Sequence, residues 1–183
     1  SRAVGAKILS ACGPDLKRVI LELGGKDALV VLEDADLEAA SEFAVNNSFR
    51  NSGQVCVSTE RIYVQDSVAD EFESLVIAKT KKFKQGDPTD ESVRVGRMVN
   101  STQRDMVLEQ LAQAVEDGAS VRCGGNTHDN YIEPTVLTGC NHDMRIMHDE
   151  TFGPICCIQR ISGDDEAIQL ANDTPYGLGG AVY

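Results

Sequence analysis

Apolar residues recur along the chain in two patterns. Short β-branched apolar runs are typical of strands. Longer segments with apolar residues three or four positions apart, as at Leu37, Ala40 and Ala44, are typical of helices that bury one face. These patterns predict strands at residues 19–23, 28–32, 61–64, 119–123, 155–161 and 178–183, an extended stretch at 131–138, and helices at 2–12, 37–49, 67–84, 102–117, 143–149 and 164–172.

The alternation of strands and helices predicts an α/β domain with a largely parallel sheet. The first predicted helix ends at Gly13-Pro14, so we expect it to belong to a different structural unit from the rest. The last predicted strand reaches the end of the chain without a closing element, and the chain begins with Ser1 rather than Met. We therefore expect a piece of a longer protein.

The composition is that of an ordinary globular domain, with 42% apolar and 25% charged residues among 183. A formal net charge of −12 argues against binding to the phosphate backbone of DNA or RNA. The apolar runs are too short to span a bilayer, and the N-terminus lacks the features of a signal peptide. We expect no nucleic-acid partner and no association with a membrane.

The cysteines and histidines exclude two further classes of protein. Six cysteines occur without a CxxC pair, and three histidines occur without the spacing of metal ligands. Cys156 and Cys157 are adjacent within an apolar run, as in a buried strand. These features favour a reduced, cytoplasmic protein without disulfides and without a metal site.

Glu22 interrupts the apolar run at residues 19–23, directly before Gly24-Gly25. Ligands of open α/β sheets bind beyond the carboxyl ends of the strands. A carboxyl group placed there among apolar neighbours would have its charged form disfavoured, as a general base working near neutral pH requires. The alternative is a glutamate on an edge strand that points into water.

Cys56 lies in a polar, glycine-containing turn between a predicted helix and a predicted strand. A thiol in such a turn is accessible, which nucleophilic catalysis needs. The alternative is a small buried apolar residue, the usual role of a free cysteine.

Glu150 precedes a turn that contains Gly153-Pro154. Its carboxylate could accept a hydrogen bond from a ligand hydroxyl, or it could be a solvated acid of a loop. The other glycine-rich segments, 24–26 and 177–180, complete neither a phosphate-binding loop nor a dinucleotide-binding fingerprint.

Three segments in combination are more specific than any of these residues alone. They are Glu-Leu-Gly-Gly-Lys at 22–26, Gly-Gln-Val-Cys at 53–56 and Glu-Thr-Phe-Gly-Pro at 150–154. Their order, and the 34 positions from Glu22 to Cys56, resemble the signature segments of the NAD(P)-dependent aldehyde dehydrogenase family. The resemblance runs over the whole chain. It implies the three-layer catalytic α/β domain of that family for residues 19–183, truncated at the C-terminus, and a helix of a mostly missing dinucleotide-binding domain for residues 1–18.

The resemblance implies a role for each residue of the site. Cys56 would be the catalytic thiol, which attacks a small-molecule aldehyde to give a thiohemiacetal and, after hydride transfer to NAD or NADP, a thioester. Glu22 would activate the water that hydrolyses this thioester. Cofactor binding is implied for Ser1, Leu23, Gly24, Glu150 and Phe152.

Three of the implied cofactor contacts can be stated more closely. Glu150 resembles the residue that binds the nicotinamide ribose, and Phe152 resembles the one that contacts the nicotinamide ring. Ser1 resembles a residue at a helix N-terminus that meets the pyrophosphate, where free N–H groups and the helix dipole favour anions.

The chain also departs from the family pattern. It lacks the N-terminal part that carries most of the dinucleotide-binding sheet and the C-terminal segment used in subunit pairing. We therefore expect that the 183-residue chain folds but has little or no dehydrogenase activity by itself, and that the full-length parent is a homo-oligomer. The aldehyde and the choice between NAD and NADP depend on residues outside this chain.

Two other functions stay open. Relatives that transfer the acyl group to coenzyme A typically lack the glutamate at the position of Glu22, so its presence favours hydrolysis. The chain could also be a non-catalytic structural or binding relative that keeps only the fold. The presence of both Glu22 and Cys56 weighs against that alternative.

Overall fold

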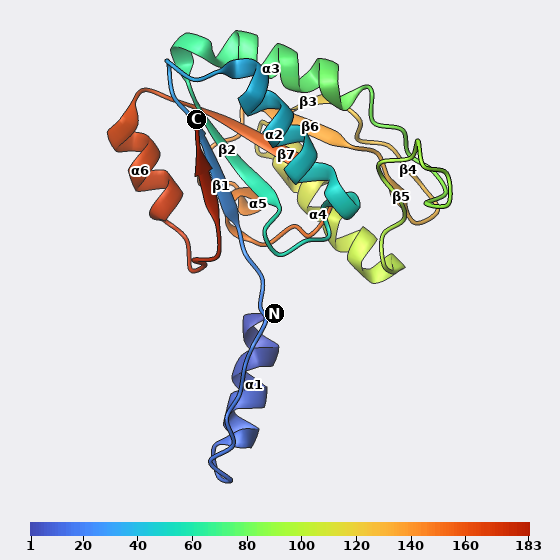
Figure 1. Ribbon diagram of the computed structural model, residues 1–183, viewed down its shortest axis with the longest axis vertical. Coiled ribbons are helices and arrows are strands. Elements are labelled where there is room, and N and C mark those ends of the chain that lie inside the picture. Colours follow the sequence, from blue (N-terminus) through green and yellow to red (C-terminus); the bar gives the residue numbers. More distant parts are fainter.

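Six strands form one sheet in the order β3-β6-β7-β2-β1-β8 in the computed structural model, which describes residues 1–183 (Figure 1). Neighbouring strands run parallel except β3 and β6, which are antiparallel. The prediction of a largely parallel α/β sheet is therefore confirmed. The strands of the sheet are β1 (Asp27–Val31), β2 (Thr59–Gln65), β3 (Ser120–Cys123), β6 (Thr135–Thr138), β7 (Ile155–Ile161) and β8 (Gly180–Val182), and a separate hairpin pairs β4 (Thr127–His128) with β5 (Tyr131–Ile132).

Helices cover both faces of the sheet (Figure 1). One face carries α2 and α3, and the other carries α4, α5 and α6. The helices are α1 (Arg2–Cys12), α2 (Leu37–Phe49), α3 (Asp66–Thr80), α4 (Ser101–Glu116), α5 (Arg145–His148) and α6 (Asp164–Asn172), with a short 3-10 turn, η1 (Arg50–Gly53), after α2. The result is the expected three-layer arrangement.

The central strands are buried on both faces, so each face has its own core. Successive side chains of a strand point to opposite faces. Leu29 packs with α2 and α3, and its neighbour Val30 packs with the helices of the opposite face. Cys156 and Cys157 divide in the same way and are both buried, as the apolar run around them predicts.

Short polar side chains cap the N-termini of two of the long helices. The Asp36 carboxylate accepts a hydrogen bond from the Ala39 N–H at 3.0 Å at the start of α2. Asn100 accepts one from the Gln103 N–H at 2.8 Å at the start of α4. The structure confirms the predicted bounds of the helices at 2–12, 37–49 and 164–172.

The predicted strand at residues 19–23 is wrong. Residues 17–26 form an extended segment without regular secondary structure. The free edges of the sheet are those of β3 and β8, and residues 18–26 form no backbone hydrogen bonds with either. This segment instead leads from the body of the molecule to α1 (Figure 1).

Several other predicted elements are shorter than expected. The helix predicted at 67–84 ends at Thr80, and the strand predicted at 178–183 is reduced to Gly180–Val182. The extended stretch at 131–138 divides into β5 and β6 around Pro134, which has no N–H to donate to a neighbouring strand. The helix expected at 143–149 is reduced to the four residues of α5.

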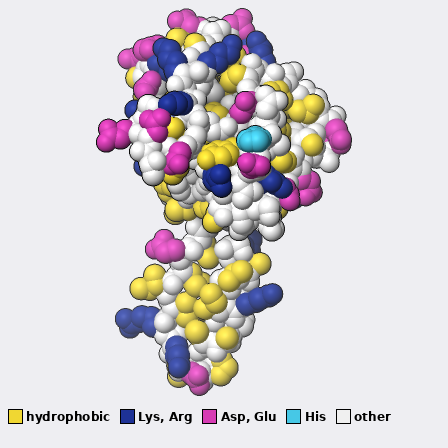
Figure 2. All heavy atoms as spheres, turned by 90° about the vertical axis from the view of Figure 1, so that its right-hand side faces the viewer, with side chains coloured by type: hydrophobic (Ala, Val, Ile, Leu, Met, Phe, Trp, Pro, Cys, Tyr) yellow, Lys and Arg dark blue, Asp and Glu magenta, His cyan; other side chains and the backbone are white.

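Helix α1 projects away from the body of the molecule (Figure 1). Figure 2 shows apolar side chains gathered on this arm, and Val4, Ile8 and Leu9 are 54%, 43% and 56% exposed. Only Gly5 of this helix is buried. None of the six α-helices combines the length and the apolar character needed to cross a membrane.

Candidate functional site

The glycine pair at residues 24–25 lies where the other two signature segments meet. A Cβ atom on Gly24 would lie 2.1 Å from Oε2 of Glu150, and one on Gly25 would lie 2.5 Å from the carbonyl oxygen of Cys56. The Gly25 N–H donates a hydrogen bond to Oε1 of Glu150 at 3.2 Å. Segments 22–26, 53–56 and 150–154, which are far apart in the sequence, therefore converge at one place.

The turn before Cys56 has an unusual backbone. Asn51, Ser52 and Gly53 have successive φ angles of 51°, 60° and 70°, all in the left-handed region. Such angles are unfavourable for residues with a side chain and persist where the surroundings impose them. A Cβ atom on Gly53 would lie 2.0 Å from the carbonyl oxygen of Gly153, so only glycine fits between the two segments.

Residues 96–99 form hydrogen bonds with the side chains of this turn. The Ser52 hydroxyl donates to the carbonyl oxygen of Gly96 at 3.1 Å and accepts from its N–H at 3.0 Å. Gln54 accepts a hydrogen bond from the Val99 N–H at 2.7 Å and donates to the carbonyl oxygen of Arg97 at 3.2 Å. These contacts restrict the motion of the segment that carries Cys56.

Cys56 is half-buried and forms no disulfide. It lies between η1 and β2, in the turn that the sequence predicts. The next residue, Val57, is 41% exposed and lines a cavity of about 230 Å³ together with Phe43 and Asn47 of α2. Cys56 itself does not line this cavity, but it is partly accessible, as a nucleophilic thiol must be.

Glu22 is exposed and lies on the extended segment rather than at the end of a strand. Its carboxylate makes no hydrogen bond or ion pair, and the residue lines a cavity of about 270 Å³ with Gly24, Tyr176 and Leu178. Leu178 also borders Gly25, which in turn packs on the Cys56 backbone. The cavity that Glu22 lines thus adjoins the glycine pair, and a shared crevice for the two reactive side chains stays a prediction.

Glu150 and Phe152 lie in the loop before β7. Burial raises the pKa of Glu150, the hydrogen bond from the Gly25 N–H lowers it, and the negative charge of Glu60 raises it, with a net rise. Only one of the two carboxylate oxygens of Glu150 accepts a hydrogen bond, so the other can accept one from a ligand hydroxyl. Phe152 has a φ of 50°, a second unusual backbone conformation at this site.

Ser1 and Leu23 belong to the arm. The Ser1 hydroxyl accepts a hydrogen bond from the Val4 N–H at 3.5 Å and caps α1. Leu23 is half-buried and borders Gly5 of that helix.

The sequence analysis missed a buried ion pair beneath the site. Lys26 and Glu60 are 1% and 3% exposed, and the Lys26 ammonium lies 2.7 Å from Oε2 of Glu60. The signal was present, since the charged pair Glu60-Arg61 directly precedes the apolar run at residues 62–64. Fully buried charges are rare unless they are paired.

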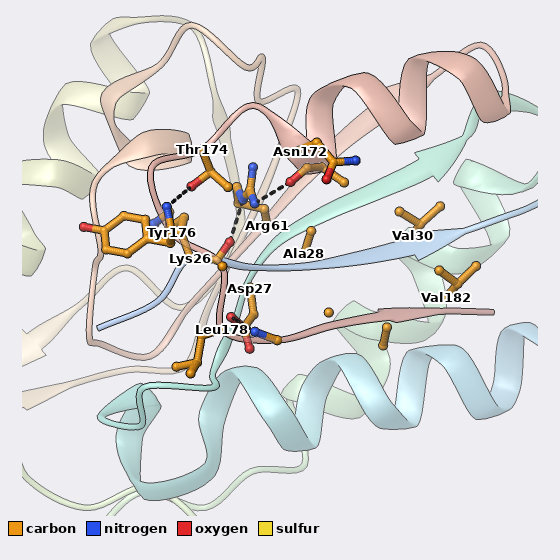
Figure 3. Close-up of a pocket in the computed structure, with 15 residues that line it drawn as sticks. Lys26, Asp27, Ala28, Val30, Arg61, Asn172, Thr174, Tyr176, Leu178 and Val182 are labelled. Atoms are coloured by element: carbon orange, nitrogen blue, oxygen red, sulfur yellow. Dashed lines mark hydrogen bonds between the residues drawn. The ribbon is translucent and has the colours of Figure 1, made fainter. Parts of the chain in front are cut away.

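Arg61 is the second of these charged residues and is 2% exposed. It borders a cavity of about 360 Å³ between β1, β8 and the segment after α6, and donates a hydrogen bond to the carbonyl oxygen of Lys26 at 2.8 Å (Figure 3). This cavity includes none of the residues that the sequence analysis assigned to the site.

Comparison with known proteins identifies relatives over the full chain. The model of the family described as "Aldehyde dehydrogenase family" matches residues 1–183. The chain is 39% identical to the chloroplastic betaine aldehyde dehydrogenase of Atriplex hortensis over 100% of its own length and 38% of that protein. It is 41% identical to the peroxisomal aminoaldehyde dehydrogenase 2 of Pisum sativum, over 100% of its length and 37% of that protein.

A solved structure gives the same result for the fold. The betaine aldehyde dehydrogenase of Staphylococcus aureus in complex with NAD+ is 36% identical, with a TM-score of 0.94 over 99% of this chain and 37% of that chain. This chain therefore spans well under half the length of the relatives that it matches.

Proposed function

The chain belongs to the aldehyde dehydrogenase family, and on this basis we propose that it is the thiol-bearing part of an enzyme that oxidises an aldehyde to a carboxylic acid with NAD or NADP. The observation that carries the proposal is the convergence at the glycine pair. Gly24 borders the Glu150 carboxylate, and Gly25 packs on the backbone of Cys56. This proximity supports the proposed roles of Cys56 as the nucleophile and of Glu150 as a carboxylate that binds the cofactor.

The residues present fit a nicotinamide cofactor. Glu150 is half-buried and has a carboxylate oxygen without a donor, as the recognition of ribose hydroxyls requires. Phe152 is half-buried in the same loop and supplies an aromatic surface. Ser1 caps the N-terminus of α1, where N–H groups favour an anion such as a pyrophosphate. Leu23 and Gly24 connect these two places.

The proposed chemistry divides oxidation into two steps. The Cys56 thiolate adds to the aldehyde carbon, and the backbone N–H of Cys56 stabilises the resulting oxyanion. A bound nicotinamide supplies the acceptor for the hydride that leaves this carbon. The acyl group then remains on sulfur as a thioester. Glu22 takes a proton from water, which attacks the thioester and releases the carboxylic acid and the thiol.

An ester with a good leaving group tests this assignment without a cofactor. Cys56 would displace p-nitrophenolate from p-nitrophenyl acetate, and Glu22 would assist hydrolysis of the acetyl-enzyme. We expect that Cys56→Ala abolishes the release of p-nitrophenolate by the chain. We expect that Glu22→Gln keeps the first turnover and slows later ones by at least about 100-fold, the usual contribution of a general base.

Matched variants separate these roles from general effects. Cys12→Ala removes another half-buried thiol, and Glu33→Gln removes another exposed carboxylate, so both should behave as the unaltered chain does. Loss of the initial release in Cys12→Ala, or its retention in Cys56→Ala, would contradict the proposal. Fast later turnovers in Glu22→Gln would instead favour an acyl acceptor other than water.

The remaining properties follow from the same proposal. The isolated chain should not reduce NAD or NADP with an aldehyde, because it spans 38% of a relative such as the Atriplex enzyme. A homo-oligomer is proposed for the longer protein. A cytoplasmic location is proposed because all six cysteines are free thiols, although the relatives named above are chloroplastic and peroxisomal.

A further inference from the structure

The loop that carries Glu150 and Phe152 rests on one buried carboxylate. Oε2 of Glu60 accepts a hydrogen bond from the Thr151 N–H at 2.8 Å, and Oε1 accepts one from the Phe152 N–H at 2.9 Å. Both oxygens of one side chain on β2 therefore bind consecutive N–H groups of a loop about 90 positions away in the sequence. Hydrogen bonds to a charged acceptor are stronger than those between neutral groups.

The positive charge of Lys26 compensates the negative charge of the buried Glu60 carboxylate. Its ammonium contacts Oε2 of Glu60 at 2.7 Å and donates to the Thr151 hydroxyl at 2.9 Å. A buried carboxylate without a partner would be strongly destabilising. Lys26 directly follows the glycine pair, and Gly25 of that pair borders the Cys56 backbone. The ion pair therefore links Glu60 on β2 to the segment that contacts Cys56.

Helix α4 holds the other side of the loop. Gln103 donates to the carbonyl oxygens of Thr151 and Phe152 at 3.0 and 3.3 Å. Gln110 donates to the carbonyl oxygen of Glu150 at 3.2 Å and accepts from the Thr151 hydroxyl at 2.9 Å. Buried or half-buried side chains thus bind the carbonyl oxygens of residues 150–152 and the N–H groups of Thr151 and Phe152.

This arrangement accounts for the backbone of Phe152. A φ of 50° is unfavourable for a phenylalanine and is kept only where its surroundings impose it. Glu60 binds the Phe152 N–H, and Gln103 binds its carbonyl oxygen, so both sides of the strained residue are restrained. The restraint also sets the direction of Glu150, two positions earlier, whose carboxylate accepts a hydrogen bond from the Gly25 N–H.

We infer that Glu60 is a positioning residue, which fixes the Glu150–Phe152 loop in the conformation that presents the Glu150 carboxylate to the glycine pair. This inference rests on the proposed function, because the loop matters for catalysis only if Glu150 and Phe152 bind the cofactor. Glu60 acts through the backbone of the loop and does not itself contact the cofactor.

Amide hydrogen exchange on the full 183-residue chain tests the positioning directly. Glu60→Gln removes the charged acceptor but leaves Lys26 buried and unpaired. The double variant Lys26→Met with Glu60→Gln removes both charges, so it avoids an unpaired ion and should fold if the single variant does not. We expect that the amides of Phe152 and Gly25 exchange at least about tenfold faster in these variants, because their local opening becomes easier.

Glu73→Gln is the matched control. Like Glu60, Glu73 is a buried carboxylate in an ion pair, and its partner is Arg160 at 3.0 Å. Glu73 lies on α3 and does not contact the Glu150–Phe152 loop. We expect that this variant leaves the exchange of Phe152 and Gly25 unchanged. Equal exchange of these two amides in the double variant and the unaltered chain would overturn the inference.

Nicotinamide mononucleotide is the probe for the cofactor, followed by the NMR signals of Gly25 and Phe152. We expect weaker binding, by about tenfold, in the Glu60 variants and unchanged binding in Glu73→Gln, which a general loss of stability would not produce. Weaker binding in Glu73→Gln to the same extent would overturn the positioning role. A third outcome is that the amides exchange faster in the Glu60 variants while the unaltered chain does not bind nicotinamide mononucleotide. In that case the proposed cofactor site is wrong, but the restraint of the loop by Glu60 is confirmed.

Discussion

Glu150 shows, at the scale of a residue, how burying a carboxyl group in the proposed cofactor site lowers the stability of the fold. Burial raises the pKa of its carboxyl above the ordinary value near 4.5, since the Gly25 N–H compensates only part of the burial and Glu60 adds a like charge. The folded chain therefore holds the proton more tightly than the unfolded chain does. Stability is lost as the pH rises through the raised pKa, where the buried group becomes charged.

Replacing this carboxyl by its neutral amide should remove the loss of stability that its ionisation causes. We expect that Glu150→Gln is more stable than the unaltered chain at pH 7, by about 0.5 kcal/mol because solvent screens a half-buried group. The difference should disappear below about pH 4, where the carboxyl is protonated in both states. Urea unfolding at the two pH values measures this, with exposed Glu91→Gln as a control. A variant less stable at pH 7 would contradict the pKa argument.

Arg61 shows, at the scale of an element, how one side chain attaches a helix. Its guanidinium donates to the carbonyl oxygen of Leu170 at 3.1 Å, near the C-terminus of α6. It also donates to those of Ala171 at 3.1 Å and Lys26 at 2.8 Å (Figure 3). The last carbonyl groups of a helix lack partners within it and attract a positive charge. Arg61 therefore ties α6 to the start of β1.

Loss of this side chain should loosen α6. We expect that Arg61→Met destabilises the chain by about 3 kcal/mol, because several buried carbonyl groups lose their donor. Arg61→Lys should recover only part of this loss, since an ammonium cannot reproduce the planar array of donors. Exposed Arg94→Met should change the free energy of unfolding by less than about 0.5 kcal/mol. Similar urea midpoints for the two methionine variants would argue against the attachment.

At the scale of the whole molecule, the chain consists of a body and an arm. Helix α1 contacts residues 21 and 23 of the extended segment through Gly5, and it has no extensive packing with any helix or strand of the body. Its exposed apolar side chains form much of the surface of the arm in Figure 2. The division at residues 18 and 19 stays a prediction of domain structure.

Deletion of residues 1–18 tests this division. We expect that the remainder keeps its free energy of unfolding to within about 1 kcal/mol, because the cooperative core lies in the sheet and its covering helices. Deletion of residues 180–183 is the comparison, since it removes β8 from the edge of β1 and should cost more. A large loss on removal of the arm would mean that α1 belongs to the cooperative unit of the body.

Local patterns were sufficient for most of the secondary structure. Helix α2 begins at Asp36 because its carboxylate caps the helix, and its apolar spacing indicates which face is buried. The apolar run at 155–161 became β7 with unchanged bounds. The run at 19–23 has the same local pattern and is not a strand, because strand formation needs a partner and this segment leads away from the sheet toward α1 (Figure 1).

The sequence by itself determined the residue types of the candidate site, the order of its three segments and the α/β class, because these depend on local periodicity and on chemical groups that can be read directly. Only the tertiary structure decided that Gly25 lies on the backbone of Cys56 and that Glu60 pairs with Lys26 beneath Phe152. Such contacts join positions 31 to 92 residues apart. The partners that make a buried charge or a strained φ tolerable are therefore present only after the sheet has brought these positions together.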